Sequence, residues 1–184
     1  MIGDLLLALW FFAPAGLANM APILVAHAPY LKRFNTPIDF GRKFRGRTIL
    51  GAHKTWRGIL AGTLAGILII SLQKFAYENY AWAYDISAGL DYSQLPIILG
   101  GLMGFGALAG DAIKSFFKRQ FNYDSGDSWF PFDQLDYIIG GLLASLLIVR
   151  LEPIHYLLIF LIYFALHLIS SFIGYKLKLK SKPI

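Results

Sequence analysis

Pro153-Ile-His-Tyr-Leu-Leu-Ile-Phe-Leu-Ile-Tyr-Phe-Ala-Leu-His-Leu-Ile-Ser-Ser-Phe-Ile-Gly-Tyr175 is a stretch without a single Asp, Glu, Lys or Arg residue. About 20 residues, rising ~1.5 Å each, cross the ~30 Å hydrocarbon core of a bilayer, so this stretch predicts a membrane-spanning helix. The whole chain agrees, because 57% of its residues are hydrophobic and 15% are charged, against roughly 25% charged in soluble domains. The sequence therefore predicts an integral membrane protein.

Further apolar runs lie upstream of this stretch. The run 58–77 is long enough to span the bilayer if Lys74 extends its ammonium group to the interface. The run 134–151 is short, which suggests that it begins in a polar cavity. The first run has no basic segment before it, so we expect a retained helix rather than a signal peptide. Together the runs predict an all-α polytopic membrane protein with about five transmembrane helices, formed by residues 1–184 as one domain. The expected spans are 5–26, 58–77, 92–113, 134–151 and 153–175, and the expected cytoplasmic loops are 28–57 and 114–133.

Basic residues set the expected orientation, because Lys and Arg accumulate in cytoplasmic loops. Fifteen of the 17 lie in the segment 32–57, in the segment 114–119 or in the tail 176–182, and Lys74 and Arg150 fall on the other side. This distribution predicts a multi-pass protein of the cell membrane with its N-terminus outside and its C-terminus in the cytoplasm. The formal charge of +6 is thus explained by topology, and nucleic-acid binding is not expected. The chain has no cysteine, so any metal must bind oxygen or imidazole ligands.

An acidic and basic motif, Gly110-Asp111-Ala-Ile-Lys114-Ser115-Phe-Phe-Lys118-Arg119, closes the third run. On a continuing helix, Asp111, Ser115 and Lys118 share one face. The motif is typical either of a solvated helix end with weak surface ion pairs or of a site that binds phosphates. Its cytoplasmic position would give such a site access to nucleotides and to lipid of the inner leaflet.

Two further carboxylates, Asp133 and Asp136, follow Pro131 in the first turn of the next expected helix. They are either caps that complement the helix dipole or partners of Asp111 across a short loop. Three converging carboxylates repel each other unless cations neutralise them. An oxygen-only ligand set with room for phosphate oxygens suits Mg²⁺.

The first expected cytoplasmic loop ends in His53-Lys54-Thr55-Trp56-Arg57-Gly58. This is not a phosphate-binding loop of the Gly-x-x-x-x-Gly-Lys-Ser/Thr type, because His stands where that motif has Gly. Basic residues beside a helix N-terminus nevertheless favour an anion, so Lys54 and Arg57 are candidate nucleotide contacts. The four histidines of the chain show no metal-ligand spacing.

Glycines recur every fourth residue at positions 58, 62 and 66, at 100 and 104, and at 106 and 110. Small residues at this spacing allow close helix contact in a bilayer. The pattern predicts a packing seam within the chain or between chains.

The order and spacing of these motifs resemble the CTP-dependent cytidylyltransferases that make CDP-activated lipids. Pro131-x-Asp133-Gln134-x-Asp136 lacks the Gly-His-Gly-Gly insertion and the arginine of the bacterial phosphatidate cytidylyltransferases. Together with Lys54-Thr55-Trp56-Arg57-Gly58 and the small size of the chain, it is similar to the ether-lipid branch, the CDP-archaeol synthase family. Two N-terminal segments, Ala18-Asn19-Met-Ala-Pro22 and Pro37-Ile38-Asp39-Phe-Gly41, extend the resemblance over nearly the whole chain.

The resemblance implies transfer of CMP from CTP to unsaturated archaetidic acid, with release of pyrophosphate. In that interpretation Asp111, Asp133 and Asp136 hold one or two Mg²⁺ ions, and Ser115 donates a hydrogen bond to a phosphate oxygen. Lys118 and Arg119 bind the pyrophosphate or the lipid phosphate, and the nucleotide is anchored by Lys54, Thr55 and Arg57. Two alternatives are a CTP-dependent polyprenol kinase and, from another class, a small membrane transporter.

Overall fold

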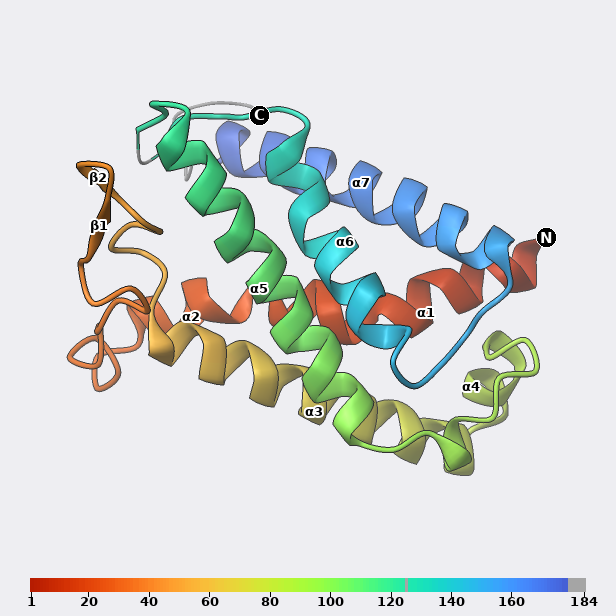
Figure 1. The fold of residues 1–184 in the computed structure, drawn as a ribbon. Coiled ribbons are helices and arrows are strands. Elements are labelled where there is room, and N and C mark those ends of the chain that lie inside the picture. The colour runs from red at the N-terminus through yellow and green to blue at the C-terminus, as the bar shows by residue number, and fades with distance from the viewer. Residues whose placement is uncertain (125, 179–184) are drawn as a thin grey trace.

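The computed structural model describes residues 1–124 and 126–178 of the chain. Helices dominate it, and the described residues form only one small sheet, an antiparallel hairpin (Figure 1). The elements in chain order are α1 (Ile2–Ala18), α2 (Ala21–His27), β1 (Lys43–Phe44), β2 (Arg47–Thr48), α3 (Trp56–Asn79), α4 (Ala81–Ile86), η1 (Tyr92–Gln94), α5 (Ile98–Gln120), α6 (Phe132–Ser145) and α7 (Pro153–Lys176).

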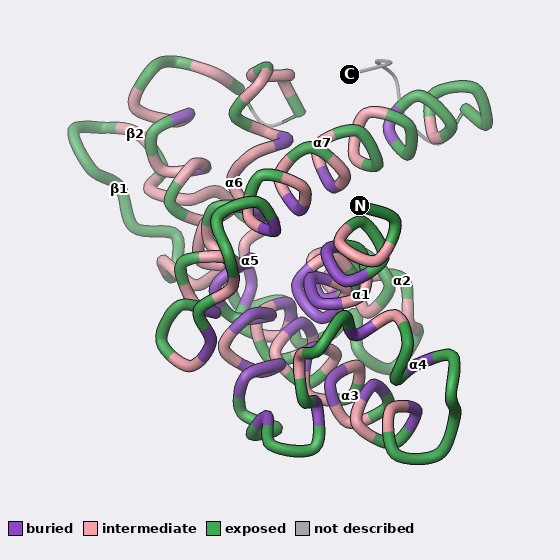
Figure 2. Tube along the Cα trace, turned by 90° about the vertical axis from the view of Figure 1, so that its right-hand side faces the viewer, coloured by how far each residue is buried: buried purple, intermediate pink, exposed green. Residues whose placement is uncertain are grey.

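The first expected span is divided into two helices. α1 ends at Ala18, two residues intervene, and α2 begins at Ala21 with Pro22 in its first turn, where a missing N–H group costs nothing. α1 is central to the molecule, and Figure 2 shows its buried turns surrounded by the other helices. The core combines apolar side chains of α1, α5, α6 and α7, among them Leu7, Phe11, Phe12, Leu99, Met103, Ile138 and Ile159.

Three helical segments are long and apolar enough to cross a membrane: Ile2–His27, Trp56–Asn79 and Pro153–Lys176. The other two expected spans differ in their limits. α5 begins at Ile98 instead of residue 92 and runs on to Gln120, so its charged second half extends the helix beyond residue 113. α6 ends at Ser145 and has 14 residues, a length of ~21 Å that is shorter than the hydrocarbon core. The loop between α5 and α6 is correspondingly shorter than the expected 114–133.

The glycine seam lies within the chain. A Cβ atom added to Gly66 of α3 would collide with the carbonyl oxygen of Gly100 in α5, and one added to Gly140 of α6 would collide with that of Gly106. α5 therefore contacts α3 and α6 backbone to backbone on two different faces. In a bilayer, where no hydrophobic drive joins helices, such close contact supplies van der Waals attraction.

Lys74 of α3 does not simply extend toward an interface. Its ammonium group donates hydrogen bonds to the carbonyl oxygens of Leu95 at 2.6 Å, Ser93 at 2.7 Å and Tyr92 at 3.1 Å. Lys74 thereby fixes the turn η1 and the entry into α5.

Replacing Lys74 by Met is expected to lower the free energy of unfolding by about 1.5–3 kcal/mol, the range for one hydrogen bond to a charged group. The reason is that the three carbonyl groups lose their shared donor. Thermal unfolding of the detergent-solubilised protein measures the effect. Lys32→Met, at an exposed position, is the control, and equal unfolding temperatures for the two variants would contradict the expectation.

Candidate active site

Three carboxylates from two helices converge on one ammonium group. Nζ of Lys114 lies 2.6 Å from Oδ1 of Asp133, 3.0 Å from Oδ2 of Asp136 and 3.3 Å from Oδ1 of Asp111. Asp111 and Lys114 belong to α5, whereas the other two residues belong to α6. The structure thus brings together the three carboxylates that the sequence pattern groups.

A glycine contact sets the spacing of this cluster. A Cβ atom on Gly110 would collide with the carbonyl oxygen of Asp136, and it would lie only 3.3 Å from the Cα atom of Gly140. α5 and α6 therefore touch at the turn that carries the carboxylates. The absence of a side chain at residue 110 is what lets Asp111 and Asp136 reach the same ammonium group.

Two more lysines complete the cluster. Lys54, in the loop before α3, forms an ion pair with Oδ2 of Asp111. Lys118 is buried and lies 2.9 Å from Oδ2 of Asp133, and it also donates to the carbonyl oxygen of Asp127. The three ammonium groups and the three carboxylates therefore have formal charges that cancel. We call these six residues the charge cluster.

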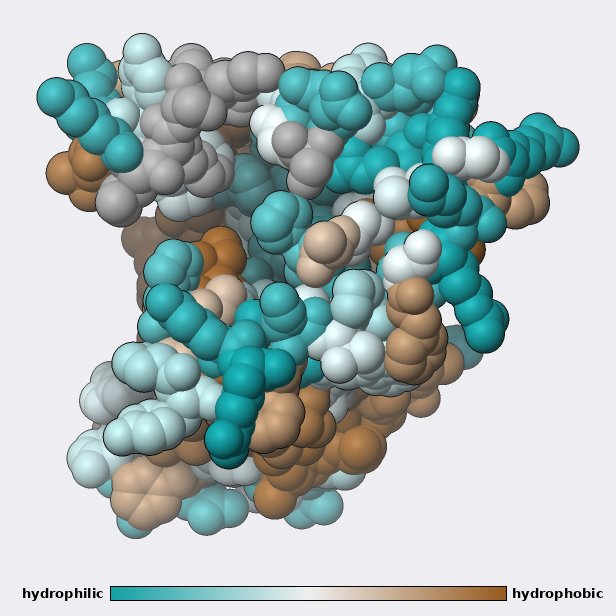
Figure 3. All heavy atoms as spheres, turned by 90° about the vertical axis from the view of Figure 1, so that its left-hand side faces the viewer, coloured by the Kyte–Doolittle hydropathy of each residue, from teal (hydrophilic) through white to brown (hydrophobic). Residues whose placement is uncertain are grey.

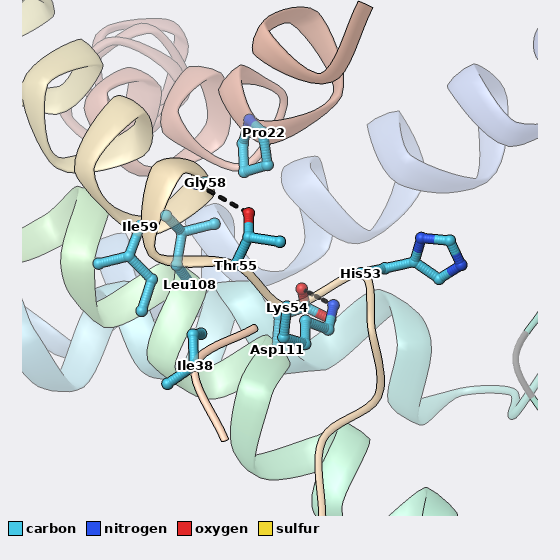
Figure 4. Close-up of a pocket in the computed structure, with 9 residues that line it drawn as sticks. All are labelled: Pro22, Ile38, His53, Lys54, Thr55, Gly58, Ile59, Leu108 and Asp111. Atoms are coloured by element: carbon cyan, nitrogen blue, oxygen red, sulfur yellow. Dashed lines mark hydrogen bonds and ion pairs between the residues drawn. The ribbon is translucent and has the colours of Figure 1, made fainter. Parts of the chain in front are cut away.

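Backbone pairing holds Lys54 in place. The segment 36–38 runs beside the segment 54–56, with the amide of Ile38 donating to the carbonyl oxygen of Lys54 at 2.8 Å. Thr55 caps α3 by accepting a hydrogen bond from the amide of Gly58 at 3.1 Å. Figure 4 shows the ion pair between Lys54 and Asp111 directly below this cap.

Asp39 braces the same loop from its other end. Its carboxylate accepts hydrogen bonds from three backbone amides, those of Gly41, Leu50 and Gly51. Burial alone would raise the pKa of Asp39, but the amide hydrogen bonds outweigh it and hold this pKa below its ordinary value. The loop that presents Lys54 is thus ordered by an ionised side chain.

A cavity of about 480 Å³ opens beside the charge cluster. Its walls come from the α1–α2 junction, the loop before α3, and helices α5, α6 and α7. The lining residues are Asn19, Pro22, Ile23, Ala26, His27, Asn35, Ala52, His53, Lys54, Thr55, Arg57, Asp111, Asp133, Asp136 and His167. Figure 3 shows the end of the molecule that carries the hairpin and the loops, where hydrophilic residues gather around a hollowed surface.

Most of the predicted site residues line this cavity, and some do not. Asp111, Asp133, Asp136, Lys54, Thr55 and Arg57 are lining residues. Ser115 and Lys118 are instead buried in the protein. Arg119 donates to the carbonyl oxygen of Tyr123 at 2.5 Å and does not line the cavity.

Several residues of the site escaped the sequence reasoning. Lys114 is not among the residues predicted to share a face with Asp111, yet it contacts all three carboxylates; its position one turn after Asp111 is the signal that the sequence offers. Asp39 belongs to a segment that carries the family resemblance, Pro37-Ile38-Asp39-Phe-Gly41, but the sequence gives no sign that it binds three backbone amides. The three lining histidines, His27, His53 and His167, are far apart in the sequence, so only the fold reveals that they share one cavity.

The donor chemistry of the cluster fits Mg²⁺, because three carboxylates that face one cationic centre are hard oxygen ligands. Among residues 1–124 and 126–178, however, no group of three His, Asp or Glu side chains is already spaced to hold a metal ion. The ammonium group of Lys114 lies between the carboxylates. A metal at this point therefore has to displace Lys114 or bind beside it.

Comparison with protein families gives a match over the full chain. The family model described as "CarS-like: CDP-archaeol synthase" matches residues 1–184. The CDP-archaeol synthase of Archaeoglobus fulgidus is 36% identical over 196 residues, covering 100% of this chain and 99% of the relative. That of Methanospirillum hungatei is 40% identical over 157 residues, covering 80% of this chain and 89% of the relative.

One solved structure is similar in fold and in sequence. It comes from work described as structural insight into an intramembrane enzyme for archaeal membrane lipids biosynthesis. The TM-score is 0.70 at 28% sequence identity, and the match covers 89% of this chain and 92% of the other.

Proposed function

The chain belongs to the CDP-archaeol synthase family and is a CTP-dependent cytidylyltransferase, and from this premise we propose that it transfers CMP from CTP to unsaturated archaetidic acid, 2,3-bis-O-geranylgeranylglycerol 1-phosphate. The products are CDP-archaeol and pyrophosphate. The observation that carries the proposal is the convergence of carboxylates from α5 and α6 with Lys54 at the wall of one cavity.

In the proposed topology, five helical segments lie in the cell membrane and the cavity opens to the cytoplasm. α5 and α6 are not apolar spans by themselves, so in this proposal they are held in the membrane by their glycine contacts with each other and with α3. The basic segment 32–57 lies beside the cavity, which supports a cytoplasmic position by the positive-inside rule.

The proposed reaction needs no protein nucleophile. A lipid phosphate monoester has a second pKa of ~6 and is largely a dianion at neutral pH. One of its oxygens attacks the α-phosphorus of CTP, the bond from that phosphorus to the bridging β-phosphate oxygen breaks, and pyrophosphate leaves. The protein contributes alignment and charge stabilisation, which supply most of the catalysis in phosphoryl transfer.

Roles follow from the positions of the side chains. Lys54 and Arg57, which line the cavity at the start of α3, bind the triphosphate, and Thr55 fixes their loop. Lys118 holds Asp133 in place through its ion pair. Ser115 and Arg119 lie off the cavity, and we assign them no contact with substrate.

Asp111, Asp133 and Asp136 are the residues that would hold Mg²⁺, as one or two ions. Bound there, the metal supplies Lewis-acid stabilisation of charge on the phosphate oxygens. Lys114, whose ammonium group lies between these carboxylates, would be a further donor for the phosphates where the metal displaced it.

CTP labelled at the α-phosphate or at the γ-phosphate tests the reaction. With purified protein, Mg²⁺ and the ether-lipid phosphate, we expect the α-label in an organic-soluble product and the γ-label in water-soluble pyrophosphate. A polyprenol kinase gives the opposite result with polyprenol, because it moves the γ-phosphate into lipid. Phosphatidic acid as a second acceptor measures the preference for the ether lipid. Absence of α-label from every lipid would contradict the proposal.

A further inference from the structure

Two walls of the cavity, α2 and α7, are not packed against each other. Both helices contribute lining residues, yet among the described residues no Cα atom of α2 lies within 8 Å of one in α7. Figure 2 likewise shows the tubes of α2 and α7 lying apart. Exposed apolar side chains lie close by in sequence, Ile23 and Leu24 on α2 and Leu166 and Ile169 on α7. A lateral opening between these helices, with apolar edges, would suit a lipid whose phosphate enters the cavity while its chains stay in the bilayer.

Each side of this opening carries a histidine. His27 ends α2, and His167 lies on α7. His53 belongs to the loop before α3, and in Figure 4 its ring extends away from Lys54 and Asp111. All three residues line the same cavity, and the ring of His167 also packs against that of Tyr137, with the ring centroids 5.7 Å apart.

The permanent cations of the cavity do not suffice for two phosphate compounds. The ammonium group of Lys54 is engaged by Asp111. Among the lining residues that the structure describes, Arg57 alone is a permanent cation without a carboxylate partner, and its buried Nε has no hydrogen-bond acceptor. A nucleoside triphosphate takes up these two groups. Lys114 does not line the cavity, so the lipid phosphate needs other N–H donors among the lining residues.

Imidazole has the chemistry for this position. Lys or Arg would place a permanent charge at an opening to the bilayer, which is costly, whereas imidazole exists in a neutral form. Nδ1 of His27 lies 2.8 Å from the carbonyl oxygen of Ile23, so Nδ1 donates there and Nε2 is left for a ligand. When a phosphate monoanion binds beside a neutral ring, its proton can move from the phosphate oxygen to Nε2. The products of this transfer are a protonated ring and the phosphate dianion. The resulting pair presents the dianion that the transfer reaction uses.

We infer that the lateral opening between α2 and α7 admits the acceptor lipid, and that His27 and His167, with His53 behind them, form its phosphate-binding subsite. This inference rests on the proposed function and adds the route and the binding residues of the lipid. His27 and His167 come from α2 and α7, whereas Lys54 and Arg57, which we assign to the triphosphate, come from the loop before α3 and the start of α3.

Two substitutions of His27 test the role of one ring atom. In His27→Asn the side-chain amide takes the place of Nδ1 and keeps the hydrogen bond to the carbonyl oxygen of Ile23, but nothing takes the place of Nε2. In His27→Gln the amide nitrogen takes the place of Nε2. We expect KM for the lipid phosphate to rise at least tenfold in His27→Asn, with KM for CTP unchanged, and to be partly restored in His27→Gln. His167→Asn is expected to act in the same direction. His155→Asn, at the opposite end of α7, is the matched control and should leave both KM values unchanged.

Equilibrium binding of a dialkylglycerol phosphate to the purified full-length protein gives a readout that does not depend on turnover. We expect weaker binding to His27→Asn and to His167→Asn, and no difference among the variants for the same lipid without its phosphate. Unchanged lipid affinity in both variants would overturn the inference, as would an equal rise of KM for CTP. If the wild-type protein transfers no CMP to lipid but binds the lipid phosphate through these histidines, the proposed function fails and the subsite stands.

Discussion

Replacing Asp111 by Asn is expected to lower the rate of CMP transfer by at least ~10²–10³-fold, the loss seen when one preorganised electrostatic group is removed from an active site. Asp111 joins the two halves of the site, because it pairs with Lys54 of the loop and with Lys114 of α5. The substitution keeps the size of the side chain but removes its charge. The charge cluster then has a surplus positive charge and one proposed metal ligand fewer. Initial rates with α-labelled CTP measure the loss.

Folding of this variant has to be checked separately. We expect Asp111→Asn to elute like the wild-type protein in size-exclusion chromatography and to retain a cooperative thermal transition. Asp85→Asn in α4 is the matched control, since Asp85 is an exposed residue far from the cavity in the fold, and it should keep wild-type activity. Wild-type activity in Asp111→Asn would remove this residue from the proposed metal ligands.

Gly110→Ala is expected to reduce activity by ~10²-fold, the scale for a misplacement of about 1 Å at a reacting centre. The added methyl group collides with the backbone of Asp136, so α5 and α6 have to separate at the turn that holds the carboxylates. Overpacking of this kind also costs about 1–3 kcal/mol of stability. Activity and the thermal transition should therefore both fall, although no polar group has been changed.

Gly3→Ala is the matched control for this substitution. Gly3 lies in α1, and a Cβ atom there would contact only the Cβ atom of Ala88, at 3.9 Å. We expect wild-type activity and equal or slightly greater stability, because Ala favours a helix over Gly. If Gly110→Ala behaved like Gly3→Ala, close backbone contact would not be what sets the geometry of the site.

Hydropathy alone identified the membrane class and the long helices of the structure. α3 and α7 lie close to their expected limits because their apolar runs are bounded by Arg57 and Pro153. The start of α5 was less predictable, since residues 92–97 carry no charge and so do not end a run, but they form a turn that Lys74 holds through its carbonyl groups. α6 ends at Ser145 because the next apolar residues form turns, in which Leu147 and Ile148 donate to carbonyl oxygens three residues earlier. A hydropathy profile carries no information about either backbone feature.

The acidic residues of the site were predictable from their types and positions, whereas their partners were not. An ionised Asp at a membrane boundary costs enough free energy to indicate either a function or a neighbouring cation that neutralises it. The cation that neutralises each carboxylate is determined by the contact between α5 and α6. This contact places Lys114 at the centre of the cluster and Lys118 next to Asp133. The histidines needed the complete fold, since they come from three distant segments.

The mutual neutralisation within the charge cluster also bears on how the chain enters the bilayer during synthesis. Lys114 and Lys118 of α5 leave the ribosome before Asp133 and Asp136, their counter-charges on α6, have been made. An isolated α5 would thus present ionic groups that lipid tolerates poorly. We therefore expect this pair of helices to integrate together, as a preassembled hairpin, after the self-sufficient first spans are already in place.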